Sequence, residues 1–172
     1  LAAMLAIIGL SMLLPILVAY VYREPDISGY IYSMIACFLF AIPVWLVTRK
    51  SRKLSSRDGF ALVTFAWLIV AVAGSLPFYF SGVIPNYTDA WFEAMSGVTT
   101  TGATIIGSQE TLPHLTNGIE SLPKSILFWR SFLQWIGGMG IIVFTIAILP
   151  LLGVGGVPVS YTHLTLPTNT PV

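Results

Sequence analysis

Charged side chains are scarce in this sequence, and their scarcity decides the class of protein. Only 9% of the 172 residues are Asp, Glu, Lys or Arg, whereas 56% are hydrophobic. An ordinary soluble domain carries about 25% charged residues. The composition therefore indicates an integral membrane protein, in which nearly all of the backbone satisfies its hydrogen bonds in helices or in segments that protein shields from lipid.

Cysteine and histidine are nearly missing too. A single cysteine, Cys37, excludes a disulfide framework and leaves no cysteine spacing for a metal site. The two histidines, His114 and His163, both lie outside the long apolar runs. An intramembrane enzyme needs a nucleophile with a base, or a metal cluster, at membrane depth. We therefore predict that the chain is not an enzyme and holds no cofactor.

Four apolar runs are long enough to cross a membrane, which takes about 20 helical residues. We predict spans at 1–22, 30–48, 60–80 and 125–152. Pro15 should kink the first span. The last span is long enough to require a tilt or a break, and the Gly-Gly-Met-Gly sequence at 137–140 is the natural place for a break. Close packing against another helix is the alternative role for these glycines.

Positive charge concentrates between the second and third spans. The sequence reads RKSRK at 49–53, and Arg57 follows shortly. The positive-inside rule places the loop 49–59 in the cytoplasm, together with the N-terminus, and the loop 106–123 outside. A nucleic-acid or lipid-headgroup site is the alternative, but basic clusters beside spans usually set topology. We therefore expect contact with membrane lipid and none with nucleic acid.

A short apolar segment precedes a run of threonines between the third and fourth spans. Residues 90–98 are compatible with a helix but have about half the length needed to cross. Residues 99–104 read TTTGAT, which is too polar to face lipid. Irregular backbone at membrane depth is tolerated only where protein buries it or where it lines a water-filled cavity. The pattern predicts a pore loop, although threonine-rich turns also occur as plain external loops.

This loop offers oxygen ligands to a cation. Rings of backbone carbonyls can replace the hydration oxygens of an ion without adding a full charge. Gly102 can take a positive φ and so turn a carbonyl toward the ion. The short helix, if it enters from outside, points its negative C-terminal end at the same place. Asn86, Thr88 or Asp89 can cap its start.

Two charges, Glu93 and Arg130, are predicted at membrane depth, where an ionisable group is costly and is normally paired. We predict that they form a structural pair that braces the pore helix against the following span. The alternative is that each reaches water separately, with Arg130 extending outward along its aliphatic stem.

Long motifs resemble the Trk/Ktr/HKT potassium transporters, and in particular the bacterial Trk membrane subunit. The run DAWFEAMSGVTTTGAT at 89–104 is similar to the first pore loop of that superfamily. The segment LPK at 122–124, with LQWIGGMGII at 133–142 and AILP at 147–150, is similar to the helix that follows the loop. The resemblance covers roughly residues 1–156.

The resemblance implies an all-α integral membrane fold. Residues 1–48 would be the two extra N-terminal helices of the Trk branch. Residues 60–152 would be the first membrane-pore-membrane repeat of a four-repeat, potassium-channel-like fold, with the re-entrant pore helix and filter at about 89–105. In this family each repeat has a single reliable filter glycine, and Gly102 fits that position.

The resemblance also implies the site. The filter residues would be Thr99, Thr100, Thr101, Gly102 and Ala103, with carbonyls supplied by the last four and potassium bound at Thr100, Thr101 and Gly102. The implied activity is channel-like potassium uptake across the bacterial cytoplasmic membrane. The implied partners are a second copy of the subunit and a cytoplasmic nucleotide-binding Trk regulatory subunit.

The length departs from the family pattern, because the other three repeats are missing. One quarter of a ring of carbonyls cannot select an ion. We expect the chain to be a truncated N-terminal part. The alternatives are a non-transporting membrane fragment, or a single-repeat subunit of a homotetrameric cation channel. Residues 153–172 form a tail that we expect to be disordered, and from residue 158 onward its Thr- and Pro-rich sequence suggests a chimeric or frame-shifted, non-native end.

Overall fold

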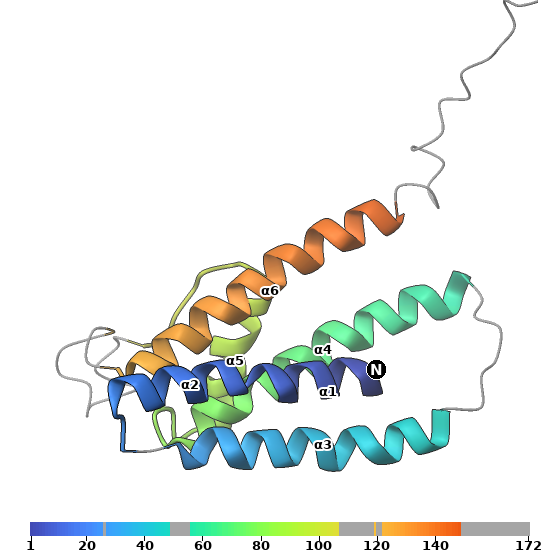
Figure 1. Ribbon diagram of the computed structural model, residues 1–172. Helices are drawn as coiled ribbons and strands as arrows, with labels where there is room; N and C mark the ends of the chain where they lie inside the picture. The colour runs from blue at the N-terminus through green and yellow to red at the C-terminus, as the bar shows by residue number, and fades with distance from the viewer. Residues whose placement is uncertain (26, 49–55, 107–118, 120–121, 149–172) are drawn as a thin grey trace, which may run out of the picture. The chain divides into compact units, whose positions relative to one another are not determined.

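The computed structural model describes residues 1–25, 27–48, 56–106, 119 and 122–148 (Figure 1). The helices in these ranges are α1 (Ala2–Ser11), α2 (Leu13–Tyr22), α3 (Ser28–Thr48), α4 (Ser56–Phe80), α5 (Tyr87–Val98) and α6 (Lys124–Ile148). The chain divides into two compact units, Leu1–Gly138 and Met139–Val172.

Four helical stretches are long and apolar enough to cross a membrane. They are Ala2–Tyr22, Ser28–Thr48, Ala61–Phe80 and Lys124–Val143, which confirms the four predicted spans. In contrast, α5 has 12 residues and is about 18 Å long at 1.5 Å per residue, whereas the hydrocarbon core is about 30 Å thick. The all-helical, multi-pass membrane class is therefore confirmed, and α5 is a helix too short to span.

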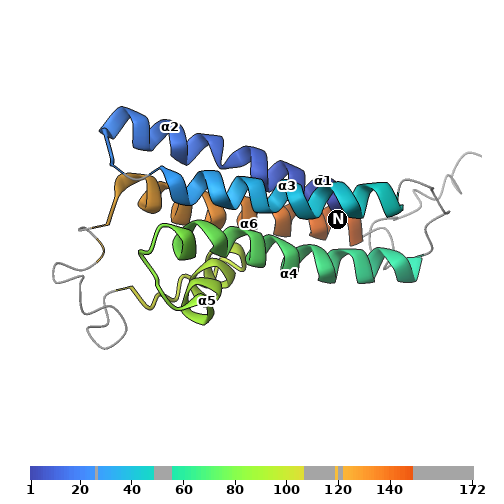
Figure 2. The ribbon, with the colours of Figure 1, turned by 90° about the horizontal axis from the view of Figure 1, so that it is seen from below.

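The first span is divided at Met12, shortly before Pro15, where a kink was predicted. α1 ends at Ser11 and α2 begins at Leu13, with Met12 between them. Pro15 has no N–H to donate to the carbonyl four residues earlier, and the Ser11 hydroxyl donates to the Ile8 carbonyl over 2.7 Å. The interruption is mild, because α2 continues roughly in the direction of α1 (Figures 1 and 2).

The predicted break in the last span is wrong. α6 runs without interruption from Lys124 to Ile148. The physical reason is that glycine, unlike proline, keeps its N–H and places no ring against the preceding turn, so the helical hydrogen bonds continue through 137–140. The alternative role holds for Gly137, which packs against α5.

One loop boundary differs from the prediction, and several predicted segments lie outside the described residues. α4 begins at Ser56, so the loop predicted at 49–59 ends earlier than expected. The remainder of that loop at 49–55, most of the loop 106–123, the end of the last predicted span at 149–152 and the tail 153–172 lie outside the described residues.

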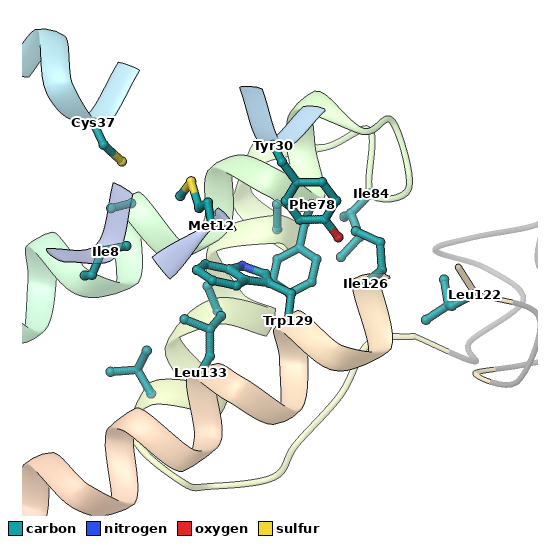
Figure 3. Close-up of a cluster of buried hydrophobic side chains, with 14 of the residues drawn as sticks. Ile8, Met12, Tyr30, Cys37, Phe78, Ile84, Leu122, Ile126, Trp129 and Leu133 are labelled. Atoms are coloured by element: carbon teal, nitrogen blue, oxygen red, sulfur yellow. The ribbon is translucent and has the colours of Figure 1, made fainter. Parts of the chain in front are cut away.

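Trp129 occupies the core of the first unit (Figure 3). Its side chain is fully buried, and its Nε1–H donates to the Gly74 carbonyl of α4 over 2.9 Å. Pro77 interrupts the hydrogen bonding of α4 nearby. The buried cluster around the indole draws on α1, α3, α4, α5 and α6, including Ile8, Met12, Tyr30, Cys37, Phe78, Ala94, Val98, Ile126 and Leu133.

The start of α6 is capped from the loop after α2. The Glu24 carboxylate accepts hydrogen bonds from the Ser125 N–H, at 3.3 and 3.4 Å from its two oxygens, and from the Ser125 hydroxyl. A carboxylate is favourable there because the first N–H groups of a helix lack intrahelical acceptors. The loop between the first two spans therefore holds the helix that follows the candidate filter.

Candidate functional site

α5 packs against α4 and leads directly into the threonine run (Figure 2). Of the three predicted capping residues, Asn86 fills the role: its Oδ1 accepts the N–H of Thr88 over 3.2 Å. Asp89 lies in the first turn, where the positive end of the helix dipole favours an acidic side chain. The helix therefore begins after a capping residue, and its C-terminal end leads into the threonine run.

The C-terminal end of α5 is closed by the N–H groups of the threonines. Thr99 donates to the Met95 carbonyl over 2.8 Å, Thr100 to Gly97 over 3.0 Å and Thr101 to Ser96 over 3.0 Å. The last two bonds form a Schellman motif, in which the residue after the cap is left-handed and is usually glycine. Here that residue is Thr100, with φ 57°.

A positive φ recurs two residues later. Gly102 has φ 75°, and Thr101 between the two is not among the positive-φ residues. A positive φ is unusual for any residue with a side chain and more so for a β-branched threonine, at a cost of about 1 to 2 kcal/mol. Gly102 takes the same conformation without that cost, as the sequence predicted. In an extended strand successive carbonyls point to opposite sides, whereas alternation of φ lets neighbouring carbonyls share a side.

The threonine hydroxyls form a short directed chain. Thr99 Oγ1 donates to the Met95 carbonyl over 2.8 Å and lies 2.8 Å from Thr101 Oγ1. A hydroxyl has one proton to donate. Because the Thr99 proton is engaged, Thr101 is the donor in the contact between the two. The oxygen lone pairs of Thr101 are then left as acceptors on the exposed side of the loop.

Residues 103–105, which follow Gly102, are hydrogen-bonded to two side chains of α5. Ser96 Oγ donates to the Ala103 carbonyl over 2.6 Å. The two oxygens of Glu93 each accept from the Thr104 hydroxyl at 3.0 Å, and one of them also accepts the Ile105 N–H at 3.2 Å. The Ala103 carbonyl therefore bonds to the pore helix, whereas the resemblance implied that it would face an ion.

Glu93 also contacts Arg130 of α6. Arg130 Nε donates to Glu93 Oε1 over 2.7 Å, and the Glu93 side chain is 2% exposed while that of Arg130 is 23% exposed. The two charges expected to pair therefore lie in contact. One carboxylate thus joins three elements: the short helix, the loop and the following span.

α6 approaches the end of α5 closely. A Cβ atom on Gly137 would lie 2.0 Å from the Val98 carbonyl oxygen, so only glycine fits there. At the neighbouring Gly138 a Cβ would lie 3.9 Å from Thr100 Cγ2, which is ordinary contact. The backbone of α6 therefore packs against the last turn of α5, directly before the loop.

The structure brings together the residues that the sequence proposed for the site, and it adds Ser96. Thr99, Thr100, Thr101, Gly102 and Ala103 form one continuous exposed or half-exposed loop. Ser96 was not expected to take part, whereas Thr104 is the last residue of the predicted threonine run. Glu93 and Ser96 are three residues apart, so they lie on one face of the helix. This spacing is the sequence feature that could have indicated the role of Ser96.

Comparison with known proteins gives consistent matches. Residues 29–165 match the TrkH family, described as cation transport protein. The chain is 44% identical over 156 residues to the Trk system potassium uptake protein TrkH of Vibrio parahaemolyticus, covering 89% of this chain and 30% of that protein. It is also 44% identical over 149 residues to the protein of the same name from Escherichia coli K12, covering 85% of this chain and 29% of that protein.

A solved structure matches as well. The crystal structure of the potassium transporter TrkH from Vibrio parahaemolyticus superposes with a TM-score of 0.76 at 43% identity, over 90% of this chain and 31% of that chain. The chain thus spans about 30% of the length of the relatives that it matches.

Proposed function

The chain belongs to the TrkH family of cation transport proteins, and from that premise we propose that its residues 99–102 form one quarter of a potassium-selective filter. In the full-length transporter this filter would pass potassium into the cell in a channel-like manner. The expected role of the isolated chain is narrower, because a ring of carbonyls needs contributions from all sides of the ion.

The observation that carries the proposal is the alternation of φ at the end of a helix too short to span. Thr100 and Gly102 have φ of 57° and 75°, with Thr101 between them. This geometry allows the carbonyls of Thr100, Thr101 and Gly102 to face one side. The left-handed Thr100 closes the helix, whereas the second positive φ, at Gly102, continues the alternation into the loop.

Electrostatics at the end of α5 favour a cation. The negative end of the α5 dipole lies at Val98, immediately before the loop. Thr101 adds hydroxyl lone pairs, because its proton is donated to Thr99. A monovalent cation would therefore meet oxygen acceptors at the end of a helix whose field attracts positive charge.

We further propose that α5 enters from the outside of the bacterial cytoplasmic membrane. The basic residues at 49–53 lie between α3 and α4, and the positive-inside rule favours the cytoplasm for that loop and for the N-terminus. An aromatic group lies at the opposite ends of these helices, where Tyr32 contacts Phe80 and Tyr79 contacts both Phe80 and Tyr87. Such groups are enriched at both membrane–water interfaces, so they support an interfacial position for these ends, and the basic loop alone carries the sidedness.

The assembly proposed for the full-length protein is a homodimer that binds a cytoplasmic nucleotide-binding Trk regulatory subunit. Membership of the family supports this assembly. Light scattering of the purified full-length protein, alone and with the regulatory subunit, tests it: a monomer that elutes apart from the subunit contradicts it.

The filter assignment is tested in a chimera, in which this chain replaces the region of the E. coli relative that it matches. Gly102→Ala should lower potassium uptake in an uptake-deficient bacterium at least tenfold, because a side chain strains the left-handed conformation. Gly82→Ala is the matched control. Gly82 has φ 71°, and a Cβ on either glycine would meet nothing within 4 Å.

Both substitutions carry the same backbone strain, so they should reduce thermal stability equally. Only Gly102→Ala should reduce uptake. If Gly102→Ala transports normally, or if Gly82→Ala is equally impaired, the filter assignment is wrong. Rescue of the bacterium by the 172-residue chain alone would contradict the expectation that it needs further repeats on the same chain, and would favour a homotetramer.

A further inference from the structure

The Ala103 carbonyl is hydrogen-bonded to a side chain of α5. Ser96 Oγ donates to it over 2.6 Å. Ser96 is buried, with 6% of its surface exposed, and its own carbonyl accepts the N–H of Thr101. Ser96 therefore holds the loop on both sides of Gly102: through its backbone at Thr101 and through its hydroxyl at Ala103.

From this geometry we propose that Ser96 is a positioning residue for ion discrimination, and that the ion-facing carbonyls end at Gly102. The inference rests on the proposed filter function. The hydroxyl turns the Ala103 carbonyl toward α5 and thereby fixes the plane of the peptide that follows Ala103. The direction in which the chain leaves Gly102 is then set by the pore helix.

The two residues after Ala103 are also hydrogen-bonded to α5. The Glu93 carboxylate accepts from Thr104 and from the Ile105 N–H. Because Glu93 also pairs with Arg130, its removal would disturb both the loop and the packing of α6. Ser96 is the cleaner probe, since its side chain contacts the loop without carrying a charge.

Removing the Ser96 hydroxyl frees the Ala103 carbonyl. That carbonyl can then rotate, and the spacing of the oxygens at Gly102 is no longer held. Discrimination between potassium and sodium depends on the number and arrangement of coordinating carbonyls. Ser96→Ala is therefore expected to lower the ratio of potassium to sodium uptake about fivefold, the factor that corresponds to one net hydrogen bond.

The experiment uses the same chimera and measures uptake of both ions together with the amount of protein in the membrane. Ser75→Ala is the matched control, because Ser75 is a fully buried serine that donates over 2.7 Å to Val72 of its own helix. It should leave the ion ratio at the parental value. Ser96→Thr keeps the hydroxyl and should retain most of the discrimination.

Titration of the purified chimera with potassium and with sodium gives a second readout that does not depend on transport rate. A parental ion ratio in Ser96→Ala, or an equal loss in Ser75→Ala, overturns the inference. If Gly102→Ala abolishes uptake while Ser96→Ala keeps the parental ratio, this inference fails and the filter assignment stands. If Gly102→Ala transports normally, the filter assignment fails first.

Discussion

A Cβ atom on Gly137 would lie 2.0 Å from the carbonyl oxygen of Val98. The obstacle is backbone, so it cannot rotate away as a flexible side chain could. The contact joins α6 to the last residue of α5, directly before the candidate filter. Small residues allow such close approach of helices in membranes, where packing rather than the hydrophobic effect drives association.

We predict that Gly137→Ala separates α5 from α6 and destabilises the folded protein by about 3 kcal/mol, the upper end of the usual cost of overpacking. The matched variant is Gly138→Ala, whose Cβ would be in ordinary contact at 3.9 Å from Thr100. It should cost less than about 1 kcal/mol. Thermal unfolding of the purified protein in detergent compares the two, and equal transitions would contradict the packing role of Gly137.

Glu93 and Arg130 should be energetically coupled. Arg130→Gln leaves the nearly buried Glu93 carboxylate unpaired, which is expected to cost about 3 kcal/mol. Glu93→Gln should cost less, because Arg130 is partly exposed and can reach water. The double variant should lose less stability than the sum of the single variants.

A double-mutant cycle by thermal unfolding measures this coupling. A coupling energy below about 0.5 kcal/mol would show that each charge acts independently. An unchanged stability in Arg130→Gln would also contradict the pair.

Thr100→Gly should stabilise the protein. Thr100 has φ 57° at the position of a Schellman motif that glycine usually fills. Glycine removes a strain of about 1 kcal/mol. Thr101→Gly offers the matched control: no strain is relieved there, so it should destabilise by about 0.5 to 1 kcal/mol. Opposite shifts of the unfolding temperature are expected, and a loss of stability in Thr100→Gly would refute the strain.

Trp129→Phe should destabilise the first unit by about 1 to 3 kcal/mol, because the Gly74 carbonyl would lose its buried donor. Trp135→Phe is a suitable comparison, since Trp135 lies on the same helix with 60% of its surface exposed. That change should stay within about 0.5 kcal/mol. If chemical denaturation gives the same midpoint for both variants, the indole hydrogen bond contributes little.

The sequence predicted best those structural features that a single large free-energy term decides. The cost of polar groups in lipid predicted the four spans, the short helix and the proximity of Glu93 and Arg130. It could not predict that α6 stays helical through 137–140, because glycine permits both a break and a close contact. The bond between Ser96 and Ala103 depends on dihedral angles within the loop, and the sequence pattern leaves these open.

The closure of α5 has a consequence for the sign of the ion. Thr99, Thr100 and Thr101 each donate their backbone N–H to a carbonyl of α5, and the Thr99 hydroxyl proton is also directed into the helix. These donors are turned away from the exposed side of the loop. A chloride ion approaching this surface would find no hydrogen to bind among these groups and would meet the negative end of the α5 dipole, so the turn that ends the helix disfavours an anion.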